Sequence, residues 1–247
     1  MVEIIHINND IPKLEKSVAC IGYFDGMHKV HQKLINKCVN LSVNKNVLPS
    51  LICFSPDPDE IINHKREKHL FCEQERYTKA ASFGIQKIYV ISFSEELMNL
   101  EANVFIHDYL NQMNLEGLVC GFDFSFGRKG LGNPVLLKEV SHFPVTVIDE
   151  EKYYGKKISS TRIKENLKSG HFKLADKLLG FSYYFILEVL DCVKTDEKWL
   201  LECVNKDERG IIPKQGVYEN LFEIRNDHFY LYSDSYKDKG MRIKIEV

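Results

Sequence analysis

The 247-residue chain lacks a long hydrophobic run, a paired-cysteine motif and an excess of charge of one sign. No stretch of 18 apolar residues occurs, so we expect no membrane span. The 33 basic and 35 acidic side chains nearly cancel, which predicts no whole-chain attraction to nucleic acid or to an anionic membrane. Any phosphate chemistry must therefore depend on local arrangements of residues.

The seven cysteines are odd in number and form no C-x-x-C pair, which argues against a zinc site and a disulfide framework. The first ten residues show no basic segment followed by an apolar run and a cleavage site, so we expect no secretory signal. Together these features predict a cytoplasmic protein. Hydrophobic residues make up 44% of the chain, enough for the core of one large domain or two smaller ones.

Apolar runs rich in β-branched residues alternate with helix-like periodicity through the first two thirds of the chain. The runs predict strands over Ser17–Tyr23, Ser50–Phe54, Lys87–Ser92, Glu116–Gly121 and Val145–Ile148. The patterns between them predict helices over His31–Asn44, Cys72–Phe83, Ala102–Met113 and Pro134–Phe143. Such alternation predicts an α/β domain with a doubly wound parallel sheet.

The last third of the chain has a different character. Two short helices are predicted over Ser160–Lys168 and Phe172–Leu179, the second ending at Gly180. Strands separated by polar turns are then predicted over Tyr184–Val193, Lys198–Val204, Gly216–Ile224, His228–Tyr232 and Met241–Val247. We therefore place a boundary near residue 182, with an α/β domain over residues 1–182 and a small antiparallel β-barrel-like domain over residues 183–247.

The turn after the first predicted strand, residues 22–31, is the strongest candidate ligand site. Ligands of open parallel sheets bind beyond the carboxyl ends of the strands. Gly22 and Gly26 permit a tight backbone path, and the helix that follows points free N–H groups at an anion. His28 and His31 are three residues apart, so both imidazoles can face one phosphate. An isolated pair of this kind is more often a cap or solvent-facing, but its position after a strand and two glycines favours triphosphate binding.

Two further stretches carry candidate site residues. Ser159, Ser160 and Thr161 precede a predicted helix and by themselves indicate an N-cap. Together with Arg162 and Lys164, the same turn offers hydroxyls, N–H groups and cations to a pyrophosphate leaving group. Phe124 and Phe126 would serve equally well as core aromatics, but their glycine-flanked loop favours walls for a flat ring system.

These stretches resemble, in order, the motifs of the prokaryotic riboflavin kinase/FAD synthetase family. Residues 22–31 resemble G-x-F-D-G-x-H-x-G-H, residues 54–58 resemble F-x-P-H-P, residues 121–128 with Gly132-Asn133 resemble G-x-D-F-x-F-G-x followed by G-[DN], and residues 158–164 resemble V-S-S-T-x-I-R. The resemblance spans the predicted α/β domain.

The resemblance implies transfer of AMP from ATP to FMN, giving FAD and pyrophosphate, with Mg²⁺ accompanying ATP. The catalytic residues would be His28, His31, Ser160 and Arg162. The nucleotide would contact Gly22, Phe24, Asp25, Gly26, His28, His31, Ser159, Ser160, Thr161, Arg162 and Lys164. The flavin would contact Phe54, Pro56, Asp123, Phe124 and Phe126. Asp25 either binds metal or holds the turn; we favour the turn and expect no protein metal site.

The chain also departs from the family pattern. Val30 replaces the glycine of H-x-G-H, where the backbone usually approaches the nucleotide, Asp57 replaces the histidine of P-H-P, and Lys164 replaces an arginine. The β domain has no P-T-A-N between Gly180 and Pro213 and leaves Glu219 and Glu223 as weak candidates for the kinase glutamate. We therefore predict a monofunctional FAD synthetase. The alternatives are a non-catalytic flavin- or nucleotide-binding regulator and nucleotidyl transfer to another phosphorylated small molecule.

Overall fold

The computed structural model describes residues 2–8, 10–218 and 221–247, and its contacts divide the chain into two compact units. The first unit comprises Met1–Glu67 and Glu73–Lys157, and the second comprises Lys68–Cys72 and Ile158–Val247. The two short helices that the sequence analysis grouped with the α/β domain thus pack with the β strands. The boundary near residue 182 stays a prediction about functional modules.

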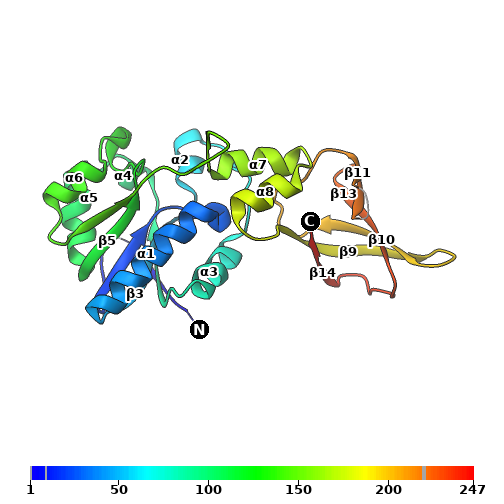
Figure 1. The fold of residues 1–247 in the computed structure, drawn as a ribbon, viewed down its shortest axis with the longest axis horizontal. Helices are drawn as coiled ribbons and strands as arrows, with labels where there is room; N and C mark the ends of the chain where they lie inside the picture. The colour runs from blue at the N-terminus through cyan, green and yellow to red at the C-terminus, as the bar shows by residue number, and fades with distance from the viewer. Residues whose placement is uncertain (1, 9, 219–220) are drawn as a thin grey trace. The chain divides into compact units, whose positions relative to one another are not determined.

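A six-stranded parallel sheet in the order β1-β4-β3-β2-β5-β6 forms the centre of the first unit (Figure 1). Its strands are β1 (Glu3–Ile7), β2 (Ser17–Ile21), β3 (Leu48–Ser55), β4 (Lys87–Ser92), β5 (Leu115–Gly121) and β6 (Val145–Ile148). The five predicted strands are confirmed. β1 was not predicted, because in this edge strand Ile7 alone is fully buried and the apolar pattern is weak.

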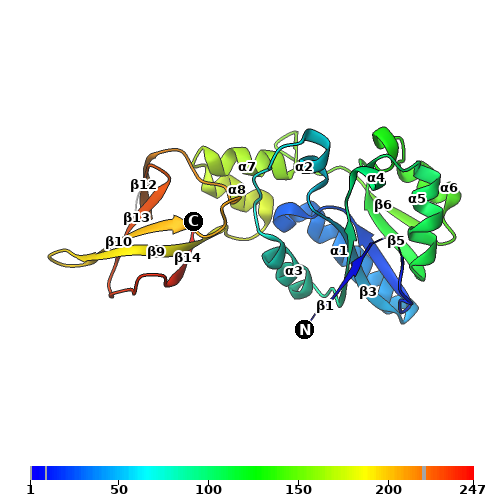
Figure 2. The ribbon, with the colours of Figure 1, turned by 180° about the vertical axis from the view of Figure 1, so that it is seen from behind.

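Helices cover both faces of this sheet, as Figures 1 and 2 show from opposite sides. They are α1 (Lys29–Lys45), α2 (Pro58–Asn63), α3 (Glu73–Ser82), α4 (Glu95–Met98), α5 (Ala102–Asp108) and α6 (Pro134–Val140). The prediction of a single helix over Ala102–Met113 is wrong in its second half, because α5 ends at Asp108 and a short 3₁₀ turn follows over Leu110–Gln112. The doubly wound α/β fold is confirmed.

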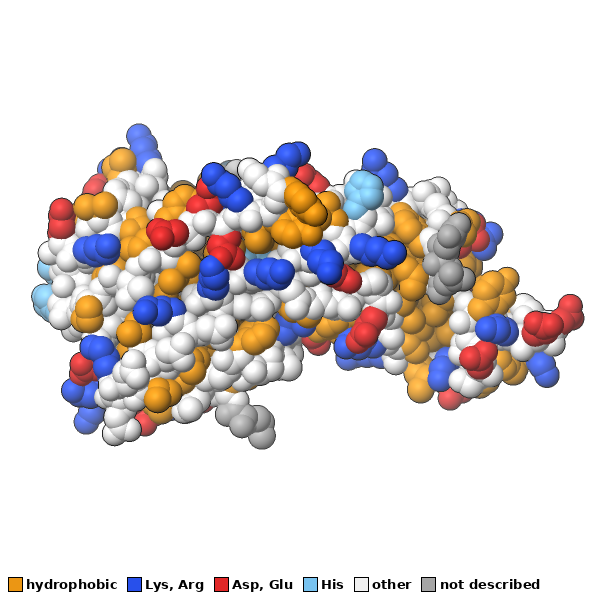
Figure 3. Space-filling view, viewed as in Figure 1, with side chains coloured by type: hydrophobic (Ala, Val, Ile, Leu, Met, Phe, Trp, Pro, Cys, Tyr) orange, Lys and Arg blue, Asp and Glu red, His pale blue; other side chains and the backbone are white. Residues whose placement is uncertain are grey.

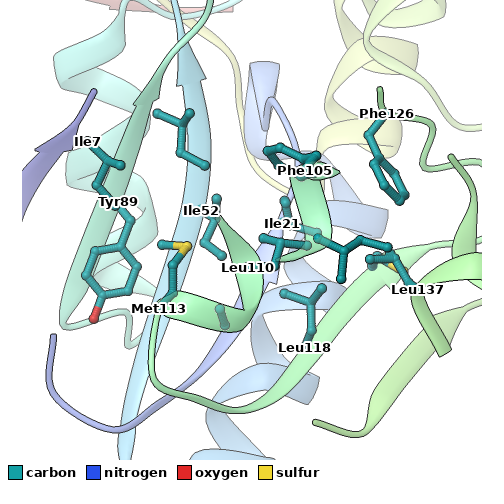
Figure 4. Packing of buried hydrophobic residues seen from close by; sticks show 14 of the residues in the cluster. Ile7, Ile21, Ile52, Tyr89, Phe105, Leu110, Met113, Leu118, Phe126 and Leu137 are labelled. Atoms are coloured by element: carbon teal, nitrogen blue, oxygen red, sulfur yellow. The ribbon is translucent and has the colours of Figure 1, made fainter. Parts of the chain in front are cut away.

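Alternate residues of the central strands enter two separate hydrophobic clusters. On β2, Ala19 and Ile21 pack against α4, α5 and α6, whereas Val18 and Cys20 pack against α1 and α3. Figure 4 shows the first cluster, where Leu118 of β5 lies among side chains from both the sheet and the helices. All seven cysteines are free and five are buried, as expected of core thiols. No helix in the described part of the chain is long and apolar enough to cross a membrane.

The second unit combines a helix pair with an antiparallel sheet. The helices are α7 (Ser160–Lys168) and α8 (Phe172–Leu179). The sheet runs in the order β11-β12-β13-β10-β9-β14, with β9 (Tyr184–Lys194), β10 (Trp199–Asn205), β11 (Gly216–Tyr218), β12 (Phe222–Arg225), β13 (His228–Ser233) and β14 (Arg242–Glu246). The single strand predicted over Gly216–Ile224 is wrong, because β11 and β12 pair antiparallel as two strands. Glu219 lies outside the described residues.

Lys68–Cys72 belongs to the second unit although it lies within the α/β sequence. The backbone N–H of His69 donates to the carbonyl of Arg209 at 2.8 Å, and the Phe71 ring lies 5.2 Å from the Tyr183 ring between centroids. The Tyr183 hydroxyl donates to the carbonyl of Leu70 at 2.8 Å. No periodicity marks such an insertion, because its partners lie more than 100 residues away in the sequence.

The sheet of the second unit leaves apolar surface uncovered. Figure 3 shows hydrophobic side chains gathered over part of this unit, and Val217 and Tyr232 are 73% and 65% exposed. A hollow of about 650 Å³ is lined by side chains of β10, β11, β12 and β13, among them Leu200, Tyr218 and Tyr230. The sheet ends in two edge strands, β11 and β14. The fold thus matches the small antiparallel β-barrel-like domain that the sequence predicted, with its sheet left open at both edges.

We expect Leu118→Ala to lower the free energy of unfolding of the first unit by about 2–5 kcal/mol, because it leaves a cavity in the core of Figure 4. Leu131→Ala is the matched control, since Leu131 is 67% exposed and its loss removes little burial. Urea unfolding of both variants measures the difference. Equal midpoints would contradict the core described above.

Candidate active site

The turn between β2 and α1 has an unusual backbone held by burial. Phe24, Gly26 and Met27 all have positive φ angles, of 60°, 80° and 46°. Glycine adopts this region without penalty at position 26, whereas Phe24 and Met27 adopt it at a cost that their surroundings must offset. Both side chains are 1% exposed and lie in the hydrophobic cluster under α1. The turn is therefore held in place by its own core residues.

His28 and His31 lie against each other where this turn enters α1. Their rings are stacked with 3.7 Å between centroids and 16° between planes, as residues three apart on one helical turn allow. His28 is 4% exposed, and His31 is half-buried beside the Phe24 ring. The Nδ1 atoms of both imidazoles are buried without a hydrogen-bond partner among the described residues. A polar ligand would satisfy these atoms.

Both imidazoles are held in the uncharged form. Burial lowers the pKa of His28 to about 4, although the nearby charge of Asp25 opposes the shift. Burial also holds the pKa of His31 well below its ordinary value, and repulsion from His28 when it is protonated and from the Arg76 cation adds to the effect. The pair is therefore neutral at pH 7 in the free protein. It can contact a phosphate as hydrogen-bond partners, but it brings no positive charge of its own.

Arg76 supplies a charge beside this turn that the sequence analysis missed. Arg76 is 6% exposed, and its guanidinium donates from Nη1 to the Tyr23 carbonyl at 2.7 Å. The guanidinium carbon also lies 4.3 Å from the centroid of the Tyr23 ring. One signal was present in the sequence: Arg76 shares a helical face with Ala80, so it is a charged residue on the buried side of α3.

Two departures from the family motifs have local explanations. Val30 is half-buried and packs against the hydrophobic cluster under α1. Asp57 is the N-cap of α2, where its carboxylate accepts from the Asp59 backbone N–H at 2.9 Å. Each replacement therefore stabilises the protein's own structure.

The predicted flavin-side phenylalanines form a continuous row of rings. Phe124 stacks on Phe126 at 5.4 Å, Phe126 lies 5.6 Å from Phe105, and Phe105 lies 6.5 Å from Phe54. Phe54 and Phe126 are each 8% exposed and belong to the core, whereas Phe124 is half-buried. Phe124 thus offers the accessible ring of the row. Phe105 links the other three and was missed, since it stands outside the four motifs.

The other two predicted flavin-side residues lie at the surface. Pro56 is exposed and follows a cis peptide bond at the end of β3. Asp123 forms an ion pair with Lys157, and the Lys157 ammonium also lies 5.2 Å from the centroid of the Phe122 ring. Asp123 is therefore engaged with a cation within the unit that holds the histidine pair.

The predicted pyrophosphate turn lies in the second unit. Ser159 is the N-cap of α7, and its hydroxyl accepts from the Arg162 N–H at 3.3 Å, so the predicted cap is confirmed. Ser160, Arg162 and Lys164 are half-buried, and Thr161 is exposed. The His28–His31 pair belongs to the first unit. That these two groups act on one nucleotide stays a prediction.

Within the described residues, no group of three or more histidine, cysteine, aspartate or glutamate side chains is arranged to hold a metal ion. Asp25 is 3% exposed inside the turn. Mg²⁺ commonly binds through substrate phosphates, waters and one or two carboxylates rather than a cage of protein ligands. The residues of this turn therefore fit an ion that arrives with ATP.

Comparisons with known proteins identify the family of the chain. A family model described as FAD synthetase matches residues 10–162, which is more than half of the chain and includes every first-unit residue of the candidate site. The chain belongs to the FAD synthetase family. The resemblance inferred from the four motifs is thereby confirmed, as is the predicted class of enzyme, a nucleotidyltransferase.

Individual relatives in the FAD synthetase family include proteins of two descriptions. A bifunctional riboflavin kinase/FMN adenylyltransferase of Listeria monocytogenes is 28% identical over 242 residues, covering 93% of this chain and 77% of the relative. A protein of the same description from Buchnera aphidicola subsp. Schizaphis graminum is 36% identical over 209 residues, covering 82% and 67%. An FAD synthetase of Listeria monocytogenes is 29% identical over 175 residues, covering 68% and 70%.

A solved structure supports the fold. The crystal structure of a macrolide-efflux protein from Streptococcus pneumoniae matches with a TM-score of 0.87 and 26% identity. The match covers 100% of this chain and 89% of that protein. This FAD synthetase family member thus shares its fold with a solved structure over both units.

The buried histidine pair predicts a pH-dependent stability. Because the pKa of His28 in the folded protein is about 4 and the ordinary value is about 6.5, the unfolded chain binds the proton first as pH falls. Stability is therefore full above about pH 6.5 and is lost toward pH 4, at up to about 1.4 kcal/mol per pH unit for this group.

Urea unfolding between pH 7 and pH 5 measures this slope. We expect His28→Gln to reduce it, because glutamine is polar but does not titrate. His107→Gln, at an exposed position on α5, is the control for the substitution itself. Equal slopes in the wild type and His28→Gln would contradict the burial described for this imidazole.

Proposed function

We propose that the protein transfers AMP from ATP to FMN, giving FAD and pyrophosphate, and has no riboflavin kinase activity. The observation that carries the proposal is the stacked pair His28 and His31, whose buried Nδ1 atoms lack a partner among the described residues. The pair lies at the carboxyl end of β2, where open parallel sheets bind ligands, and within the region that matches the FAD synthetase family.

The reaction is an in-line displacement at phosphorus. A phosphate oxygen of FMN forms a bond to the α-phosphorus of ATP, and the bond from that phosphorus to the pyrophosphate oxygen breaks. No covalent enzyme intermediate is needed, so the protein contributes positioning and charge stabilisation. His28 and His31 would contact the ATP phosphates, and Ser160 and Arg162 would contact the leaving pyrophosphate. Mg²⁺ would neutralise charge on the triphosphate.

FMN is the favoured acceptor because of the aromatic row. The half-buried ring of Phe124 is backed by Phe126, Phe105 and Phe54, which together make a rigid apolar support for a flat ring system. A phosphorylated acceptor without aromatic rings would have no use for this support. The exposed Pro56 and the paired Asp123 lie on the same unit and complete the proposed flavin side.

The packing of Val30 favours an active enzyme over a non-catalytic regulator. A valine that projected toward the nucleotide would obstruct it, whereas Val30 packs against the cluster that contains Phe24 and Met27. The substitution therefore adds buried apolar surface to the start of α1.

Purified protein incubated with FMN and Mg-ATP should release FAD and pyrophosphate, measured by chromatography. We expect His31→Gln to lower kcat/KM by about 10²–10³-fold, the range seen when one donor to a developing oxyanion is removed. Val30→Gly should keep activity within about threefold and cost about 1 kcal/mol in stability, because glycine weakens a helix. Absence of FAD at enzyme concentrations equal to the substrate would sink the proposal, and activity regained only in Val30→Gly would identify Val30 as the obstacle.

The same protein should not convert riboflavin to FMN with ATP. The β unit lacks P-T-A-N, and Glu223 is already engaged by Arg225, whose Nε lies 3.2 Å from its Oε1. Riboflavin and Mg-ATP should therefore yield neither FMN nor FAD, while FMN added to the same sample restores FAD formation. FMN production from riboflavin above the rate of a protein-free control would contradict this prediction.

A further inference from the structure

Arg76 is a buried cation that contacts the turn carrying the histidine pair. It is 6% exposed, and removing a guanidinium from water costs several kcal/mol unless other groups compensate. Nη1 has the Tyr23 carbonyl as its acceptor at 2.7 Å, while Nε is buried without a partner among the described residues. An apolar side chain of similar volume would fill this position at a lower free-energy cost. The presence of a charge here therefore requires an explanation.

Arg76 contacts the turn at its first residues. Tyr23 stands one residue before the run of positive φ angles, so a donor on its carbonyl restrains the start of the strained turn. The Tyr23 ring stacks on the guanidinium at 4.3 Å and covers it. Through these two contacts, α3 is connected to the loop that places His28 and His31.

The positive charge of Arg76 also suits a role at this turn. An ATP triphosphate at this turn meets two uncharged imidazoles, and arginine remains protonated in proteins at every accessible pH. A permanent cation behind the turn attracts the phosphates and also disfavours protonation of His31, whose pKa it lowers together with burial and His28. The groups that face Arg76 are Tyr23, Cys53, Asp25 and Tyr77.

We propose that Arg76 is a positioning residue for the triphosphate turn: it clamps the Tyr23 carbonyl and supplies the fixed positive charge that lets His28 and His31 bind phosphate as neutral hydrogen-bonding groups. This inference rests on the proposed function, because the turn is taken to bind ATP. It goes beyond it by assigning a role to a residue outside all four sequence motifs.

The test combines two measurements on Arg76→Met, Arg76→Lys and Arg225→Met. Arg225 is the matched control, since its guanidinium also stacks on a tyrosine ring, that of Tyr230 at 4.2 Å, and it belongs to the other unit. The first measurement is the NMR titration of the His31 ring without substrate, with the signal assigned through His31→Gln. The second is the KM for ATP in FAD formation.

In Arg76→Met, the pKa of His31 should move upward, because a nearby cation is gone, and the KM for ATP should rise about 10- to 100-fold, as expected for loss of a charged hydrogen bond. Arg76→Lys keeps the charge but loses the planar fork, so His31 should titrate as in the wild type while KM rises by less. Arg225→Met should change neither quantity.

An unchanged His31 titration and an unchanged KM in a folded Arg76→Met variant would overturn the inference. If Arg76→Met does not fold, Arg76→Lys serves as the test. A KM for ATP equal to that of the wild type would then count against the clamp. A raised KM together with an unchanged His31 titration would support it. A wild type that makes no FAD, with His31 still shifting in Arg76→Met, would refute the proposed function but not the positioning of the imidazole.

Discussion

The candidate site depends on a turn whose backbone is held in a strained form by burial. Phe24 and Met27 occupy left-handed conformations that few non-glycine residues adopt, and they do so with their side chains sealed in the cluster under α1. Because these side chains are buried, the two imidazoles that follow have a defined position and stack on each other. The hydrophobic core and the ligand site are thus parts of one arrangement.

Burial of the imidazoles also determines their chemistry. Desolvation keeps both rings uncharged, so the proposed affinity of the turn for phosphate must come from hydrogen bonds, from the start of α1 and from charges placed nearby. The near-neutral charge of the whole chain leads to the same requirement. A protein without a large positive field can bind a triphosphate only where its few cations and donors converge.

Much of the fold could be predicted from the sequence, because strands such as Lys87–Ser92 and Val145–Ile148 are continuous apolar runs whose bounds coincide with the structure. The sequence analysis did not predict β1, in which the exposed Glu3 and His6 interrupt the apolar residues. It also did not separate β11 from β12, because Gly216–Ile224 contains no proline and no glycine after its first residue. The membership of Lys68–Cys72 in the second unit depends on partners distant in sequence, which no local pattern encodes.

Candidate-site residues could be named from the sequence where they stand in motifs, but not where a residue acts through packing. His28, His31 and the cap at Ser159 stand in recognisable stretches, whereas Arg76 and Phe105 become informative only when α3 and α5 are placed on the sheet. Val30 shows the reverse case, because its departure from the motif suggested an obstruction and its packing indicates a structural role.

The most direct test of the account is to follow the α-phosphate of ATP. Protein incubated with FMN and ATP labelled at the α-phosphorus should place the label in FAD and leave the released pyrophosphate unlabelled. Label that remains in ATP at stoichiometric enzyme, or that appears in a product other than FAD, would contradict AMP transfer to FMN.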